Sequence, residues 1–173
     1  MKNPFQQSHS TEELQIFDFL SEVKLFELLN NDEKSHFLPY LYLRRYKQDE
    51  VVFFRGDPAH ALYVIKEGKV SLVLDVDQDF EQLAMVHPQQ SFGNNALISD
   101  AKRIYSAIVQ SSEAEMYVIP HVNVNDIFSE KSKIKAKMFD ALARMYEQHV
   151  ENLYESYRSS KGFFSLDLVD RMI

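Results

Sequence analysis

The apolar residues near the N-terminus repeat at helical spacing behind two helix-start signals. Ser10 with Glu13, and Asn30 with Glu33, each place a capping side chain three residues before a glutamate, which is typical of a capping box. The apolar residues that follow these boxes at helical spacing are Leu14, Phe17, Leu20, Phe37, Leu38 and Leu41. The pattern predicts a helix over residues 11–28 and a short second helix after it.

From about residue 42 the pattern changes to short apolar runs that are separated by turn residues. The turn signals are Gly56-Asp57-Pro58, Glu67-Gly68 and Phe92-Gly93. The expected strands are 42–46, 51–54, 61–67, 69–75, 80–87, 105–110 and 114–119. Because no helical pattern alternates with these runs, they predict an antiparallel barrel or jelly roll, which Pro120 closes.

A long helical pattern follows the expected strands. Residues 131–158 contain no glycine or proline, and apolar side chains recur every three or four positions along them. The apolar stripe consists of Met138, Phe139, Leu142, Met145, Tyr146, Val150, Leu153 and Tyr157. Such a stripe packs either on the chain's own core or on a second copy, and we expect it to form a homodimer.

These patterns together predict an α+β fold. An antiparallel, jelly-roll-like β-roll is flanked by N-terminal helices and a long C-terminal helix. The expected divisions are a flexible N-terminus over 1–10, helices and roll over 11–128, the long helix over 129–158 and a short terminal segment over 159–173. Gly162 is the expected stop of the long helix.

Composition narrows the range of functions. The 173 residues include 19 basic and 26 acidic side chains, and the net charge of −7 disfavours nucleic acid and anionic membranes as partners. There is no cysteine, and the six histidines form no His-x-His pair, so we expect neither thiol chemistry nor a metal. No apolar run approaches the ~18 residues of a membrane span. No catalytic constellation can be named either, so we expect a cytoplasmic protein that is not an enzyme.

Three segments carry glycine turns in a distinctive order. They read VVFFRGDPA over 51–59, LYVIKEGKVSLVL over 62–74 and SFGNNALISDAKRIYSAI over 91–108. In this order they resemble the cyclic-nucleotide-binding domain family, the fold of catabolite-activator-type regulators and of cyclic-nucleotide-dependent protein kinase regulatory subunits. The third segment resembles the family's phosphate-binding cassette, Phe-Gly-Glu-x-Ala-Leu followed by an arginine, which here is Arg103, eleven residues after Phe92. The resemblance covers roughly residues 17–158.

The resemblance implies a site for a cyclic nucleotide or another anion. The residues that it places there are Gly93, Asn94, Asn95, Ala96, Arg103, Ile104, Tyr105 and Ser106. It implies that backbone N–H groups from Gly93 onward and the Arg103 guanidinium hold the phosphate. The alternative for Arg103 is a surface ion pair, and the alternative for Ser106 is a hydroxyl that is solvated or paired to the backbone.

Several positions depart from the family pattern. Asn94 replaces the glutamate that accepts a hydrogen bond from the ribose 2′-hydroxyl in the family. Ile104 and Tyr105 replace small residues, and their bulk is expected to fill part of the pocket. Asp49 and Gln89 stand where the family usually has turn glycines.

We therefore expect a non-catalytic regulatory or sensor module that binds a cyclic nucleotide weakly or not at all, has no other cofactor, and signals through the long helix. The alternative is a ligand-free pseudo-domain that serves as a dimerisation or scaffold module. Regulators of the catabolite-activator type carry a helix-turn-helix after the long helix, whereas 15 residues follow Arg158 here. We therefore expect no DNA binding by this chain.

Overall fold

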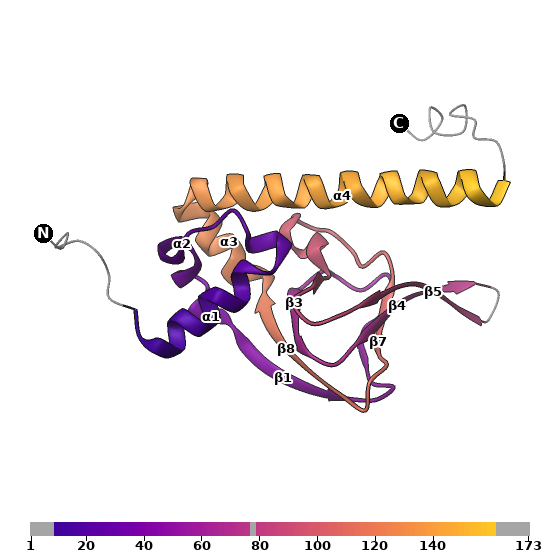
Figure 1. The fold of residues 1–173 in the computed structure, drawn as a ribbon, viewed down its shortest axis with the longest axis horizontal. Helices are drawn as coiled ribbons and strands as arrows, with labels where there is room; N and C mark the ends of the chain where they lie inside the picture. Colours follow the sequence, from indigo (N-terminus) through magenta and orange to yellow (C-terminus); the bar gives the residue numbers. More distant parts are fainter. Residues whose placement is uncertain (1–8, 77–78, 162–173) are drawn as a thin grey trace, which may run out of the picture.

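Two antiparallel sheets form the body of the molecule, and helices close one end of it (Figure 1). The computed structural model describes residues 9–76 and 79–161, and within them the strand orders are β1-β8-β3-β6 and β2-β7-β4-β5. The strands are β1 (Tyr42–Lys47), β2 (Val51–Phe53), β3 (Ala61–Glu67), β4 (Val70–Val76), β5 (Asp79–Val86), β6 (Ser91–Phe92), β7 (Ser106–Val109) and β8 (Glu113–Pro120). The predicted antiparallel roll is confirmed. The seven expected strands differ from these bounds by at most one residue at either end, and β6 was missed because two residues show no alternation.

The first helix is shorter than its pattern predicted. The N-terminal elements are α1 (Thr11–Ser21), the 3-10 helix η1 (Lys24–Phe26), α2 (Asn31–Ser35) and the 3-10 helix η2 (Leu38–Tyr40). Val23, Leu25 and Phe26 are all fully buried. Because an α-helix has about 3.6 residues per turn, four consecutive positions point all round its axis and cannot share one buried face. The chain therefore leaves the helix after Ser21, and these side chains all reach the core.

A helix that we did not predict lies between the roll and the long helix. This helix, α3 (His121–Glu130), precedes α4 (Ser132–Lys161). Lys131 separates the two with φ −124° and ψ 74°, so the predicted start of the long helix at residue 129 is wrong by three residues. The expected stop at Gly162 and the terminal segments 1–8 and 162–173 lie outside the described residues. Among the described helices, none combines the length and the apolar character needed to cross a bilayer.

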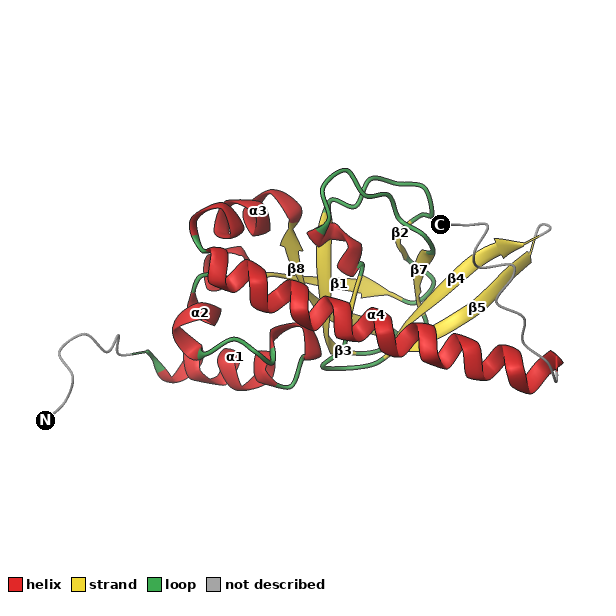
Figure 2. Ribbon diagram, turned by 90° about the horizontal axis from the view of Figure 1, so that it is seen from above, coloured by secondary structure: helices red, strands yellow, loops and turns green. Residues whose placement is uncertain are grey.

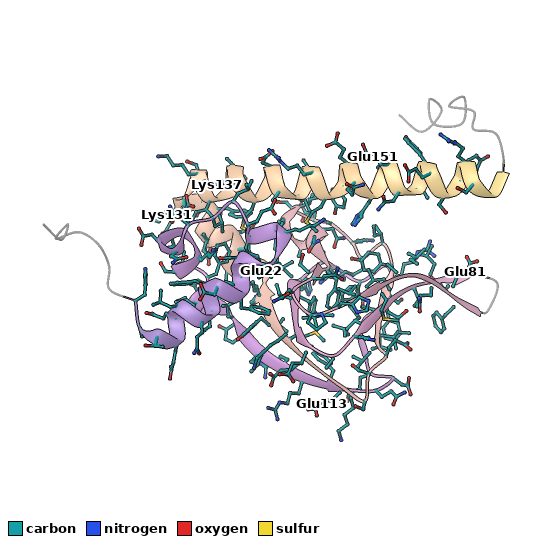
Figure 3. All side chains as sticks on the ribbon, viewed as in Figure 1. Glu22, Glu81, Glu113, Lys131, Lys137 and Glu151 are labelled. Atoms are coloured by element: carbon teal, nitrogen blue, oxygen red, sulfur yellow. The ribbon has the colours of Figure 1, made fainter. Side chains whose placement is uncertain are left out.

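The second capping box also fastens α4 to the N-terminal helices. Glu33 accepts a hydrogen bond from the Asn30 N–H (2.9 Å) and another from Lys137 Nζ (2.6 Å), and Figure 3 labels Lys137 on α4. Burial by itself would raise the pKa of Glu33, yet the hydrogen bonds from Lys137 and the Asn30 amide hold it below its ordinary value. The carboxylate is therefore ionised at neutral pH and keeps its pair with Lys137.

Asp49 and Gln89 adopt the backbone conformation of the turn glycines that they replace. Asp49 and Gln89 both have φ 65°, the left-handed region that favours glycine. Gly68 also lies in this region (φ +86°), and a Cβ there would stand 2.5 Å from the Glu113 carbonyl oxygen. The chain thus keeps a glycine at the hairpin where the backbones approach most closely, and tolerates side chains where only the dihedral angle is unusual.

The buried side chains form two cores, which fill the space inside the ribbon in Figure 3. The core between the two sheets includes Phe53, Tyr63, Ile65, Phe92, Ala107 and Met116. The core between the helices and the end of the roll includes Phe26, Phe37, Leu62, Leu97, Phe128 and Met138. The second core joins α4 to the roll.

Only the far half of the apolar stripe on α4 is open to a partner. Met138 and Leu142 are 0% and 3% exposed, because α4 lies across the N-terminal helices, and Phe139 and Met145 are half-buried against the same core. These residues therefore do not form the open seam that we expected. The exposed stripe residues are Tyr146 (36%), Val150 (44%), Leu153 (65%) and Tyr157 (39%). Figure 2 shows α4 crossing above the roll from the other helices toward the β4–β5 hairpin.

Candidate functional site

The candidate cassette lies between β6 and β7. Gly93 follows β6 with φ +67°, and a 3-10 helix, η3 (Asn94–Leu97), follows Gly93. A Cβ at Gly93 would stand 2.6 Å from Arg103 Nη1. Glycine is therefore required here both by the left-handed backbone and by the approach of the guanidinium.

Arg103 points into the roll and is 3% exposed. Its Nη1 donates to the Gly93 carbonyl (3.0 Å) and to Asn95 Oδ1 (3.2 Å), and its Nη2 donates to the Ala61 carbonyl (2.6 Å). Its Cζ lies 4.1 Å from the centre of the Phe53 ring, within cation–π range. Burial lowers the pKa of the guanidinium from its usual range. Arg103 thus joins β3 to the cassette, and its burial rules out the alternative of a surface ion pair.

Two buried polar atoms between β6 and β7 have no hydrogen-bond partner among the described residues, and Ser91 Oγ on β6 has none either. The two atoms between the strands are Arg103 Nε, which is a charged donor, and Asn94 Oδ1, which is an acceptor on a side chain that is 9% exposed. Buried polar atoms are nearly always paired, so an unpaired donor and an unpaired acceptor mark this as a place for a polar ligand. A molecule that carries both an anionic oxygen and a hydroxyl matches this pair of atoms.

Tyr105 closes the cassette from the side of the roll. The Gly93 N–H donates to the Tyr105 Oη at 3.1 Å, and the Tyr105 ring lies 5.9 Å from Phe53 between ring centres. Burial raises the pKa of this phenol, so the hydroxyl is protonated at neutral pH. The tyrosine therefore does more than occupy space, because its neutral hydroxyl oxygen accepts a hydrogen bond from the cassette backbone.

Two of the residues implied by the resemblance are not brought to Arg103. Ile104 is 64% exposed, and the Ser106 hydroxyl accepts a hydrogen bond from the Arg55 N–H (2.9 Å). Ser106 lines a hollow together with Val73, on the opposite side of β7 from the buried core. Within β7 successive side chains point to opposite faces, so Ser106 faces away from the core that Ala107 and Val109 enter, whereas Ile104 lies before the strand begins. The structure therefore agrees with the alternative for Ser106, in which its hydroxyl pairs with the backbone.

The far side of the cassette touches the helices. Ala96 is fully buried and Leu97 is 3% exposed, and both belong to the core that includes α3 and α4. The Ala96 carbonyl is in hydrogen-bond contact with His121 Nδ1 at the first residue of α3. Asn125 Nδ2 lies 2.7 Å from His121 Nε2. Nδ1 is the donor in the contact with Ala96, because a carbonyl oxygen can only accept.

The sequence pattern did not reveal the groups around Arg103 that stabilise its charge. They are the Ala61 carbonyl and the rings of Phe53 and Tyr63, which come from β2 and β3. Their apolar pattern indicated strands and carried no signal of a role beside an arginine. No cluster of three potential metal ligands occurs within residues 9–76 and 79–161.

Comparison with known proteins places this arrangement among relatives. The family model described as "Cyclic nucleotide-binding domain" matches residues 43–131. The chain is 29% identical over 106 residues to the cAMP-dependent protein kinase type II regulatory subunit of Drosophila melanogaster, covering 61% of this chain and 27% of that protein. It is 33% identical over 85 residues to the cyclic AMP receptor protein of Thermus thermophilus, covering 49% of this chain and 39% of that protein. The chain therefore spans well under half of these relatives.

Solved structures agree with the sequence matches. The catabolite activator protein of Thermus thermophilus superposes with a TM-score of 0.64 at 26% identity, covering 78% of this chain and 64% of that one. The sensor domain of a Pseudomonas aeruginosa transcriptional regulator has a TM-score of 0.67 at 15% identity, covering 82% and 95%. The second likeness is one of fold alone.

Proposed function

Because the chain belongs to the cyclic nucleotide-binding domain family, we propose that it is a non-catalytic regulatory module whose cassette binds a cyclic nucleotide weakly. The observation that carries this proposal is the unpaired Arg103 Nε together with the unpaired Asn94 Oδ1, both buried in the cassette. A cyclic phosphate supplies an anionic oxygen for the guanidinium, and a ribose hydroxyl supplies a donor for the amide oxygen.

We expect weak binding because most donors of the Arg103 guanidinium already have partners within the protein. Two guanidinium nitrogens of Arg103 are held by the Gly93 and Ala61 carbonyls and by Asn95, so a ligand must compete with these contacts. Asn94 offers a neutral acceptor where the family has a carboxylate. A hydrogen bond to a charged group is worth about 1 kcal/mol more than a neutral one, which corresponds to roughly a five- to tenfold loss in affinity.

The contacts of the cassette with the helices support a signal that travels through α4. Ala96 and Leu97 pack in the same core as Met138 and Leu142, and His121 links the Ala96 carbonyl to α3. A ligand that draws the cassette inward would therefore change the packing of both helices. Such a ligand shifts the balance between two helix positions only by its difference in affinity for them.

The test is a titration of cyclic AMP and cyclic GMP into the wild type and into Asn94→Glu, followed by calorimetry and thermal unfolding. We expect Asn94→Glu to bind about five- to tenfold more tightly, since it restores a charged acceptor. At a hundred times its Kd a ligand stabilises the fold by ~2.7 kcal/mol, which is about 5–10 °C in Tm at this chain length.

The matched control is Asn152→Glu, which makes the same charge change at an exposed position of α4. It should leave the affinity at the wild-type level. If neither the wild type nor Asn94→Glu gives heat or a Tm shift with millimolar nucleotide, the proposed function is wrong.

A second candidate function, dimerisation, is favoured by the exposed apolar face on the far half of α4. Val150 and Leu153 are 44% and 65% exposed, and Tyr146, one turn before Val150, is 36% exposed. We propose that this face pairs with a second copy of the chain. The wild type should then be a dimer by light scattering, and Leu153→Asp should be a monomer, while Asn152→Asp serves as the control. A wild type that is monomeric at tens of micromolar would remove this candidate.

A further inference from the structure

The Tyr105 hydroxyl occupies a donor that a phosphate oxygen would otherwise take. Resting on the proposed function above, we propose that Tyr105 is an intramolecular competitor of the ligand. Its hydroxyl accepts the Gly93 N–H in the closed cassette (3.1 Å) and must leave it before an anion binds. Tyr105 thereby sets the affinity of the site.

Both polar groups of Gly93 are taken by side chains of the same loop. Its N–H donates to Tyr105, and its carbonyl accepts from Arg103 Nη1 at 3.0 Å. An incoming anion competes for both partners at once, because it accepts from the Gly93 N–H and attracts the guanidinium away from the Gly93 carbonyl. Binding therefore exchanges two internal hydrogen bonds for two bonds to the ligand.

The competitor is weak enough to be displaced. Burial raises the pKa of the Tyr105 phenol, so the oxygen on the Gly93 N–H is neutral. A hydrogen bond to a phosphate oxygen is roughly twice as strong as one to a neutral hydroxyl. The anion therefore displaces the Tyr105 hydroxyl from the Gly93 N–H. The competition lowers the affinity for the ligand but does not prevent binding.

The ring of Tyr105 is held in a way that allows the hydroxyl to be removed by substitution. It packs 5.9 Å from Phe53, whose ring also lies 4.1 Å from Arg103 Cζ. Tyr105→Phe keeps this ring and removes only the oxygen, so it tests the competitor without emptying the core. Tyr46→Phe removes a hydroxyl from a side chain that packs on the same core but belongs to β1 rather than to the cassette. It is the matched control.

The sequence offers a direct probe of the contact. The chain has four glycines, and Gly93 is the one that follows a phenylalanine. Labelling phenylalanine with ¹³C at the carbonyl carbon and glycine with ¹⁵N therefore selects the single Phe92–Gly93 amide in an NMR spectrum of the full chain. We expect this amide to shift and to exchange faster with water in Tyr105→Phe, and to remain as in the wild type in Tyr46→Phe.

The decisive measurement is the affinity for cyclic AMP. We expect Tyr105→Phe to bind about three- to tenfold more tightly than the wild type, in line with the net worth of one neutral hydrogen bond. Equal or weaker binding by Tyr105→Phe, with binding still measurable in the wild type, overturns the competitor and leaves the proposed function standing. An unchanged Gly93 amide in Tyr105→Phe overturns it as well. Absence of binding in the wild type, Tyr105→Phe and Asn94→Glu overturns the proposed function, and the competitor with it.

Discussion

Replacing Arg103 with alanine should destabilise the fold, because the guanidinium connects the Gly93 carbonyl of the cassette to the Ala61 carbonyl of β3. The substitution leaves the Gly93 and Ala61 carbonyls without their donor, and a buried carbonyl without a partner costs about 1–3 kcal/mol. It also removes the cation–π contact with Phe53, worth about 1 kcal/mol. Relief from burying a charge offsets part of this loss. The expected net loss is about 3–4 kcal/mol of the free energy of unfolding.

At this chain length each kcal/mol lowers Tm by about 2–4 °C, so Arg103→Ala should melt roughly 6–16 °C below the wild type. Circular dichroism during heating, checked by urea unfolding, measures this loss. Arg103→Lys keeps a charge but cannot reach both carbonyls, so it should lie between the two. Arg144→Ala is the control, because Arg144 is largely exposed and pairs with Asp140 on the same helix, so the Tm of this variant should not change. A Tm for Arg103→Ala within about 2 °C of the wild type would refute the argument that the buried guanidinium connects these segments.

Three further predictions concern the Gly93 turn, the burial along α4 and the Glu115 ion pair. Gly93→Ala places a Cβ 2.6 Å from the buried guanidinium at a φ of +67°, so urea unfolding should show a loss of about 1–3 kcal/mol, and wild-type stability would contradict the geometry. Met138→Ala should lower the free energy of unfolding by about 2–4 kcal/mol, measured with urea, because Met138 is fully buried. Leu153→Ala should leave the free energy of unfolding of the monomer almost unchanged, because Leu153 is exposed. Equal losses would contradict the difference in burial between the two halves of α4. Hydrogen bonding, first from Lys66, holds the pKa of Glu115 below its ordinary value, so this carboxylate stabilises the fold above about pH 4.5 and the contribution is lost as pH falls. Glu115→Gln should therefore flatten the decline of Tm on acidification, and parallel acid limbs would count against this ion pair.

Local sequence patterns were sufficient to predict the strands, but they were insufficient to predict where one helix ends and the next begins. Alternation and turn residues act over a few positions, so seven strands were predicted within one residue, while the two-residue β6 was missed. The end of α1 at Ser21 depends on burying Val23, Leu25 and Phe26 together, which is a demand of the tertiary core. The apolar residues of α3 do repeat at helical spacing, but they follow directly after Pro120, at the end of a strand.

The stripe on α4 shows what periodicity leaves open. A repeat of three and four residues identifies one face of a helix, and it is the same whether that face meets the chain's own core or another copy. Met138 and Leu142 are covered by the N-terminal helices, while Leu153 on the same face is exposed. The difference lies in how far the N-terminal helices reach along α4, and no local pattern in the sequence of α4 records it.

The amide at Asn94 and the phenol at Tyr105, which depart from the family pattern, can be explained together by the way the charge of Arg103 is stabilised. With an amide rather than a carboxylate at Asn94, no acidic side chain lies within ion-pair distance of Arg103 in the described part of the chain, so its charge must be stabilised by other groups. Carbonyl dipoles from Gly93 and from Ala61, which is 42 positions away in the chain, supply that stabilisation. Tyr105 then takes the Gly93 N–H, because that donor would otherwise be buried without an acceptor. A spacing of eleven residues can identify the arginine, but the direction of its guanidinium is decided by partners on another strand. Restoring a carboxylate at Asn94 while removing the hydroxyl of Tyr105 should accordingly raise nucleotide affinity by more than either change alone, because the first strengthens the acceptor for the ribose hydroxyl and the second frees the Gly93 N–H.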